Sequence, residues 1–158
     1  MVVFIASIIF FIELIIKNYL RLNFSSQSFP VIKNIFYISV VFNRGAAFGI
    51  LKNRTTFLIY IGIFFLFLIL FLLWKEKKEK IIIKVSYGLI LGGALSNLFD
   101  RIFLGYVVDY LDFRIWPVFN LADTCISIGI GLLFLDYIKK YYAENINRSR
   151  KRKKRKVR

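Results

Sequence analysis

The stretch of sequence that decides the fold is Phe57-Leu-Ile-Tyr-Ile-Gly-Ile-Phe-Phe-Leu-Phe-Leu-Ile-Leu-Phe-Leu-Leu-Trp74, which contains no charged residue over 18 positions. A helix needs about 20 predominantly apolar residues to cross the roughly 30 Å hydrocarbon layer of a bilayer. The stretch therefore predicts a membrane span at residues 57–74, and the rest of the chain can be interpreted outward from it.

Three further apolar stretches are long enough to be spans: residues 2–20, 82–104 and 119–138, each diluted by a few polar groups. A cleaved signal peptide is the alternative for the first of them. No basic residue precedes its apolar run, however, and Glu13 and Lys17 lie where an apolar core and a small-residue cleavage site are needed. We therefore expect a retained first span and an all-α membrane protein with four transmembrane helices.

The composition agrees with a membrane protein of one domain. The chain has 158 residues, of which 58% are hydrophobic, against about half in soluble domains. This length allows one compact bundle of spans. We expect a single four-span domain over residues 1–140 and a basic cytoplasmic tail over residues 141–158, the one part polar enough to be disordered.

The basic residues predict the orientation. Residues 75–84 carry a net charge of +3 and residues 139–158 carry +10, so these two segments hold most of the formal charge of +15. Both lie on one side of a four-span chain, and the positive-inside rule makes that side cytoplasmic. Both termini are then cytoplasmic. Residues 21–55 and 105–118 face outward, although the first of these segments carries 5 basic residues and no acidic one.

Small residues predict close helix packing. Gly88, Gly92 and Ser96 are spaced by four in the third span, and Ser127 and Gly131 have the same spacing in the fourth. This spacing places small side chains on one helix face, where another helix can approach closely. The simplest architecture is a tight antiparallel bundle in which the third and fourth spans are neighbours.

The outward segment 21–55 contains a candidate strand. Residues 35–42 are β-branched and aromatic and are bounded by Pro30 and by Asn43-Arg-Gly45, which favours a short strand in a small sheet on the membrane surface. The basic tail has two interpretations, nucleic-acid binding and contact with anionic lipid headgroups. In a membrane protein we favour the lipid contact, so we expect the bilayer as its partner and no nucleic acid.

The missing side chains restrict the chemistry. The sequence has no histidine, which excludes Ser-His-Asp and Cys-His mechanisms and histidine-ligated zinc. The single Cys125 is too few for an internal disulfide or a cysteine-ligated metal site. We therefore expect no metal and no cofactor, and any acid–base catalysis is left to carboxylates, lysine or tyrosine.

Ionisable residues inside a membrane are costly and point to function. The predicted topology places Asp109 just beyond the outer end of the third span and Asp123 in the first turns of the fourth, at similar depth. One continuous helix would hold them about 21 Å apart. Gly105 and Pro117 instead favour a turn that brings the two together from neighbouring elements. Asp112 is the nearest competing carboxylate.

Two adjacent carboxylates titrate as a coupled pair and can share one proton. One can act as a base on water while the other, protonated, polarises a carbonyl group. This is the chemistry of aspartic proteases, and it requires no histidine, metal or covalent intermediate. At the outer face of a membrane, a pair formed by Asp109 and Asp123 suits a peptide bond just outside an embedded segment.

Each of these residues also has a structural interpretation. Asn120 and Asp123 have the spacing of a helix N-cap and its N3 acid. Asp109 alone can be an ordinary interfacial acid. Asp100 beside Arg101 can be an ion pair or a support for the site.

Four blocks, in this order, resemble the motifs of lipoprotein signal peptidase (signal peptidase II): Asn43-Arg-Gly-Ala-Ala-Phe48, Gly92-Gly-Ala-Leu-Ser-Asn-Leu-Phe-Asp-Arg101, Val107-Val-Asp-Tyr110 and Phe119-Asn-Leu-Ala-Asp123. The resemblance extends from the first span to the fourth and leaves out only the tail. It implies a bacterial inner-membrane aspartic endopeptidase that removes signal peptides from prolipoproteins, cleaving before a diacylglyceryl-modified cysteine. It also implies a small extracytoplasmic β-element and a short amphipathic segment, which suit residues 31–48 and 105–116.

The resemblance also implies roles for single residues. It assigns the catalytic pair to Asp109 and Asp123. It assigns supporting or substrate-binding roles to five polar residues, Asn43, Asn97, Asp100, Arg101 and Asn120. The family usually shows Asp-Gln in its first span with Lys four residues after the Asp, whereas this chain has Glu13-Leu14 and Lys17. The acidic and basic positions are kept, with one additional methylene in Glu13. The structural interpretation is that Glu13 and Lys17 form an ion pair within the membrane.

The expected function is therefore a membrane aspartic endopeptidase that acts as a monomer near the outer leaflet. A small proton-coupled transporter that uses the same carboxylates is the alternative from another class, although no inverted repeat is visible in the sequence. A non-catalytic scaffold is a further alternative. So is a Ser–Lys protease using Ser96, which is weaker because Lys17 and Lys84 have no evident reason to reach that serine.

Overall fold

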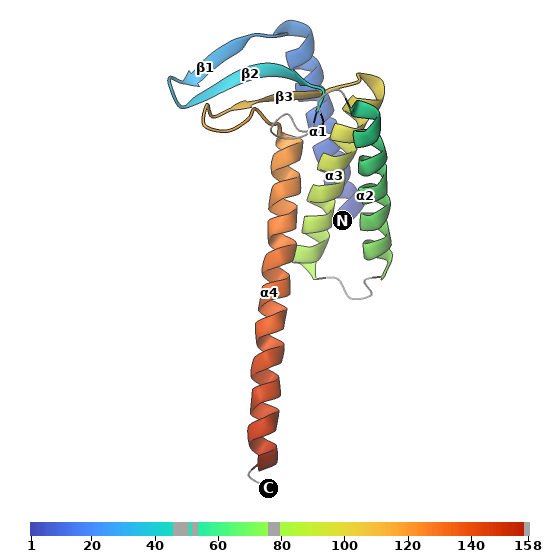
Figure 1. The fold of residues 1–158 in the computed structure, drawn as a ribbon, viewed down its shortest axis with the longest axis vertical. Helices are drawn as coiled ribbons and strands as arrows, with labels where there is room; N and C mark the ends of the chain where they lie inside the picture. The colour runs from blue at the N-terminus through green and yellow to red at the C-terminus, as the bar shows by residue number, and fades with distance from the viewer. Residues whose placement is uncertain (46–50, 52–53, 76–79, 157–158) are drawn as a thin grey trace.

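The computed structural model describes residues 1–45, 51, 54–75 and 80–156, and side chains only as far as residue 145. Figure 1 shows a bundle of four helices, α1 (Val2–Asn23), α2 (Thr55–Lys75), α3 (Ile81–Phe103) and α4 (Leu121–Lys156). All four are long and apolar enough to cross a membrane, which confirms the predicted spans. α4 continues beyond its span as one helix and includes most of the basic tail.

Helix α3 is central to the bundle and packs against α1, α2 and α4. Helix α2, which contains the uncharged stretch, has no buried residue and exposes large side chains such as Phe64, Phe67 and Trp74. Lipid tails are as apolar as these side chains, so α2 needs no protein partner around most of its surface.

Glycines determine how closely the helices approach α3. A Cβ atom on Gly92 would lie 2.8 Å from a carbonyl oxygen of α1, and one on Gly93 would collide with a carbonyl oxygen of α4. A Cβ atom on Gly129 of α4 would lie 2.7 Å from a carbonyl oxygen of α3. The third and fourth spans are therefore neighbours, as predicted. Gly92, however, contacts α1, and among the described residues a Cβ atom on Gly131 would meet no neighbouring element within 4 Å.

A three-stranded antiparallel sheet lies across one end of the bundle (Figure 1). Its strands are β1 (Ser28–Ile32), β2 (Phe36–Asn43) and β3 (Val107–Asp112), in the order β1-β2-β3. The predicted strand at residues 35–42 is confirmed as β2. The segment 105–116, expected to be short and amphipathic, contributes β3, because β2 supplies a hydrogen-bonding edge that is distant in sequence.

Strand β3 is covered on both faces, so all residues from Val107 to Tyr110 are buried. Successive side chains of a strand point to opposite faces. Val107 and Asp109 line a cavity, whereas the Tyr110 side chain contacts α1 on the other face. The strand thus places one carboxylate at a cavity and fastens itself to the bundle through the next side chain.

Candidate active site

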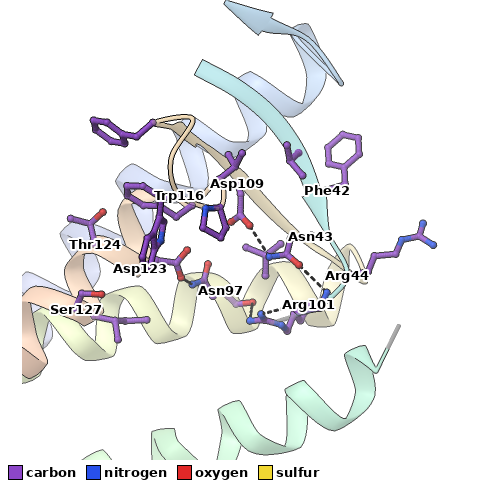
Figure 2. A pocket seen from close by; sticks show the side chains of 18 of the residues that line it. Phe42, Asn43, Arg44, Asn97, Arg101, Asp109, Trp116, Asp123, Thr124 and Ser127 are labelled. Carbon is purple, nitrogen blue, oxygen red and sulfur yellow. Dashed lines mark hydrogen bonds between the residues drawn. The ribbon is translucent and has the colours of Figure 1, made fainter. Parts of the chain in front are cut away.

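Asp109 and Asp123 line one cavity of about 980 Å³ (Figure 2). Asp109 is carried by β3, where it pairs with Val41 of β2, and Asp123 lies in the first turn of α4. Residues of β2, α3 and the loop between β3 and α4 complete the wall, most of which is apolar. The fold thus brings to one cavity two carboxylates that are 14 positions apart in the sequence.

Asn120 is fully buried and joins the two aspartates. Its Nδ2 donates to Asp109 Oδ1 at 2.7 Å, and its Oδ1 accepts from the backbone N–H of Asp123 at 2.9 Å. Asp123 returns the contact, because its Oδ2 accepts from the backbone N–H of Asn120 at 3.3 Å. The helix-cap interpretation is therefore confirmed. It does not compete with a role in the site, because the capping side chain also contacts Asp109.

Two further asparagines donate to the carboxylates (Figure 2). Asn43 Nδ2 donates to Asp109 Oδ2 at 2.8 Å. Asn97 Nδ2 donates to Asp123 Oδ1 at 2.8 Å. Each amide is oriented by a donor at its own oxygen, a backbone N–H at 2.9 Å for Asn43 and Lys17 Nζ at 2.9 Å for Asn97. The N–H groups of both amides consequently face the carboxylates.

Lys17 is buried beneath the site and confirms the predicted pairing of the first span. Its Nζ lies 3.3 Å from Glu13 Oε2 and 3.0 Å from Asp100 Oδ2. It also donates to Ser96 Oγ at 3.1 Å, so the expectation that no lysine reaches Ser96 is wrong. Neither residue is among the described residues that line the cavity, and Lys17 is engaged by two carboxylates, so the contact does not form a nucleophile and its base at that surface.

Asp100 and Arg101 support the site in different ways. Asp100 Oδ2 accepts from the backbone N–H of Val108 at 3.2 Å and thereby holds β3 next to Asp109. Arg101 lines the cavity and donates to two backbone carbonyl oxygens at 3.3 and 3.4 Å (Figure 2). Adjacent residues of α3 therefore connect the helix to the strand and to the cavity wall.

The first motif block is only partly described. Asn43, Arg44 and Gly45 line the cavity. The remaining residues of that block, 46–48, lie outside the described part of the chain.

Asp112, the competing carboxylate, belongs to another cluster. Its Oδ2 accepts from Ser39 Oγ at 2.7 Å, and its Oδ1 accepts from the backbone N–H of Arg114 at 2.8 Å. Burial raises the pKa of Asp112, but these hydrogen bonds and the charge of Arg114 outweigh burial and hold the pKa below its ordinary value. Asp112 is absent from the described lining of the cavity.

The environment of Asp109 favours a protonated carboxyl group. Burial and the neighbouring Asp123 carboxylate raise the pKa of Asp109 to about 7, against hydrogen bonds from Asn43 and Asn120 and the charge of Lys17. A pKa near neutrality suits proton transfer at physiological pH. Asp123 is buried as well, but it lies in the first turn of α4, where the helix dipole stabilises a negative charge.

Tyr110 ends one of the motif blocks, but the sequence assigns it no role. Its hydroxyl donates to Glu13 Oε1 at 2.8 Å and accepts from the backbone N–H of Leu121 at 3.3 Å. Glu13 Oε1 also accepts from the backbone N–H of Ala122 at 3.0 Å. Burial and the Glu13 carboxylate raise the pKa of Tyr110. The intramembrane Glu13 is the feature of the sequence that could have indicated a buried partner. Its partners come from β3 and α4, which only the fold brings near α1.

Known proteins are similar to this chain over most of its length. The family model described as signal peptidase (SPase) II matches residues 5–139. A lipoprotein signal peptidase of Halothermothrix orenii is 53% identical over 110 residues, which cover 70% of this chain and 75% of that protein. A lipoprotein signal peptidase of Desulfitobacterium hafniense is 44% identical over 130 residues, which cover 81% of this chain and 86% of that protein.

Solved structures agree in fold. A bacterial membrane enzyme determined by the in meso method at 2.3 Å resolution matches with a TM-score of 0.82 at 31% identity, covering 89% of this chain and 88% of that one. A second, at 1.9 Å resolution, has a TM-score of 0.79 at 31% identity and covers 87% and 92%. Because the family model covers most of the sequence and the relatives are similar over most of their own length, the chain belongs to the signal peptidase II family.

Proposed function

We propose that this protein is a membrane aspartic endopeptidase that removes signal peptides from prolipoproteins by cleaving before a diacylglyceryl-modified cysteine. Membership of a peptidase family supports the activity, and the lipoprotein signal peptidases among its relatives support the substrate class. The observation that carries the aspartic mechanism is the position of Asp109 and Asp123 on one cavity, joined by Asn120. Family membership also favours a peptidase over the alternative of a proton-coupled transporter.

In this mechanism the two carboxylates have different protonation states. We assign the negative charge to Asp123, because the dipole of α4 and the N–H groups of Asn97 and Asn120 stabilise that charge against the cost of burial. Asp109 holds the proton, because burial and the charge of Asp123 raise its pKa to about 7. The pair thus contains one base and one acid.

The reaction follows from this assignment. Asp123 removes a proton from water while the water oxygen attacks the scissile carbonyl carbon, and the Asp109 carboxyl group donates a hydrogen bond to the carbonyl oxygen. The resulting tetrahedral intermediate collapses when the proton on Asp123 passes to the leaving nitrogen and the C–N bond breaks. Asn43, Asn97 and Asn120 hold the carboxylates, and Arg101 is positioned on the wall to bind the substrate backbone.

We assign the site to the outer leaflet of the bacterial inner membrane and both termini to the cytoplasm. The sheet and the cavity are at one end of the bundle, and the end of α2, the start of α3 and the tail are at the other (Figure 1). The basic residues of 75–84 and 139–158 support a cytoplasmic position for that second end. Residues 1–140 then form one catalytic domain, active as a monomer, and the tail, of which residues 141–156 continue α4, contacts anionic lipid headgroups.

The test is cleavage of a lipidated prolipoprotein peptide by the Asp109→Asn and Asp123→Asn variants. Asparagine keeps the size of the side chain but can neither ionise nor share a proton, so we expect kcat to fall about 10²- to 10⁴-fold in each. Asp136→Asn is the matched control. Asp136 pairs with Lys80 at 2.6 Å, far along α4 from the site, and its replacement leaves kcat unchanged. Full cleavage by either site variant would refute the assignment.

A further inference from the structure

A second polar cluster lies where the three strands meet the loop that follows β3. Ser39 Oγ donates to Asp112 Oδ2 at 2.7 Å and lies 2.7 Å from Ser28 Oγ, which accepts from Arg114 Nη2 at 3.3 Å. The guanidinium carbon of Arg114 lies 3.6 Å from the centre of the Tyr37 ring, a cation–π contact. We call these five residues the sheet clasp, and they join all three strands to the loop.

The backbone of Arg114 shows why the clasp is needed. Arg114 has φ of +65°, in the left-handed region that residues with a Cβ atom seldom adopt. A residue keeps such a conformation only where its surroundings over-determine it. Here the backbone N–H of Arg114 donates to Asp112 Oδ1 at 2.8 Å, and its Nε lies 3.6 Å from Asp112 Oδ2. The clasp therefore sets the direction in which the chain leaves β3.

The loop that the clasp directs forms much of the apolar cavity wall. Phe113 and every residue from Ile115 to Phe119 line the same cavity as Asp109 and Asp123. Figure 2 shows Trp116 in the wall of the cavity that Asp109 and Asp123 also line. Phe113 stacks on Phe119 with ring centroids 6.0 Å apart, and backbone hydrogen bonds tie Phe119 to Leu111, whereas Ile115 is 94% exposed and Trp116 is 58% exposed. The course of the chain through Arg114 therefore sets the position of the exposed part of the wall, Ile115 and Trp116, between these two anchored ends.

We infer that Arg114 is a positioning residue that governs binding of the apolar part of the substrate, and this inference rests on the proposed function. An apolar wall binds acyl chains or apolar side chains in proportion to the area it removes from water. If the wall is formed only part of the time, the apparent affinity for the substrate falls in proportion to the fraction of time for which it is formed. The carboxylates are held separately, by Asn43, Asn97 and Asn120, so the loop affects binding and leaves the chemical step intact.

The experiment measures kcat and KM of the full-length enzyme in nanodiscs for Arg114→Ala, Arg114→Gly and Arg114→Lys. We expect Arg114→Ala to raise KM about tenfold, with kcat within about twofold of wild type. Arg114→Gly relaxes the left-handed backbone but also removes the clasp, so its KM rises equally. Arg114→Lys keeps the charge without the planar fork and gives an intermediate KM. Lys33→Ala, which removes an exposed basic residue from the β1–β2 turn, is the matched control and leaves both constants unchanged.

Two lipidated peptides that differ only in acyl-chain length identify what the wall contacts. A rise in KM confined to the long-chain peptide supports binding of the acyl chains, and an equal rise for both supports binding of the signal peptide. An unchanged KM in all three Arg114 variants overturns the inference, and so does a fall in kcat at constant KM. Unfolding midpoints measured on the same samples identify any variant that fails to fold. If Arg114→Ala or Arg114→Gly fails, the KM of Arg114→Lys tests the inference. Loss of cleavage by Asp109→Asn tests the proposed function independently of these outcomes.

Discussion

At the scale of single residues, Asn120 both caps helix α4 and contacts the carboxylate pair. Its amide has both a donor and an acceptor, and each is used, the donor on Asp109 and the acceptor on the first turn of α4. Aspartate at this position would cap the helix but could not donate to Asp109. Asparagine therefore suits this position better than other capping residues, because β3 places the Asp109 carboxylate next to its N–H donor.

The protonation of Asp109 predicts the pH dependence of cleavage. A carboxyl group whose pKa is raised to about 7 keeps its proton below that pH and loses it above. If protonated Asp109 is required, kcat/KM falls about tenfold per pH unit above about pH 7. Rates measured between about pH 5.5 and 9 check this.

The control for this prediction is Asn43→Ala. The hydrogen bond from Asn43 lowers the pKa of Asp109, so its removal moves the falling limb of the profile to higher pH. A rate that rises through neutrality would contradict the assignment of the proton to Asp109.

At the scale of elements, a buried glutamate of α1 connects the strand and the helix that carry the two aspartates. Glu13 contacts the Tyr110 hydroxyl of β3 and the backbone N–H of Ala122 in α4 through one oxygen, and its other oxygen lies near Lys17. The residue is completely buried. The glutamate that departs from the usual family pattern thus acts as a staple between three elements.

This staple predicts a graded loss of stability. Glu13→Ala leaves Lys17 with one carboxylate fewer in a buried site, which lowers the free energy of unfolding by about 3–5 kcal/mol. Glu13→Gln keeps an acceptor for Tyr110 and Ala122, so we expect a smaller loss of about 1–3 kcal/mol. Denaturant unfolding in detergent micelles measures both.

The matched control is Ile12→Ala, one position earlier on the exposed side of α1, which changes the same free energy by less than about 0.5 kcal/mol. Equal stability of Glu13→Ala and Ile12→Ala would show that the contacts of Glu13 do not hold the three elements together.

At the scale of the whole molecule, charge and chemistry lie at opposite ends. The cavity is at the sheet end of the bundle, whereas α4 continues away from that end and takes most of the basic tail with it (Figure 1). Lys80, which immediately precedes α3, pairs at 2.6 Å with Asp136 of α4, outside the cavity lining. Under the proposed function, the positive-inside rule places cleavage on one side of the membrane and the contact of the tail with anionic lipid on the other.

This orientation predicts which vesicles expose the tail. Trypsin cleaves after lysine and arginine, which are dense in residues 148–158. We expect it to shorten the protein in inverted vesicles and to leave the C-terminus intact in right-side-out vesicles. Loss of a C-terminal epitope measures the cleavage. As a control, trypsin treatment of the detergent-solubilised protein shows that the tail can be cleaved when it is accessible. Cleavage in intact right-side-out vesicles would reverse the proposed topology.

Several features of the fold can be predicted from the sequence because they depend on local composition. The uncharged stretch from Phe57 to Trp74 needs only lipid around most of its surface, and its helix has no buried residue. The strand at residues 35–42 follows from its β-branched and aromatic side chains. The small residues of α3 predict a close neighbour but not which one, since Gly92 contacts α1 and Gly93 contacts α4.

By itself the sequence determined the four spans, their expected orientation and a short set of carboxylates, because apolar length, the position of charge and the absence of histidine act residue by residue. Only the tertiary structure decided which polar groups meet. The pairing of β3 with β2 brings Asp109 to the cavity, and the burial of Lys17 orients the Asn97 amide toward Asp123. These contacts join residues far apart in the chain, and hydrogen bonds act only over short distances in space, so no local pattern can specify them.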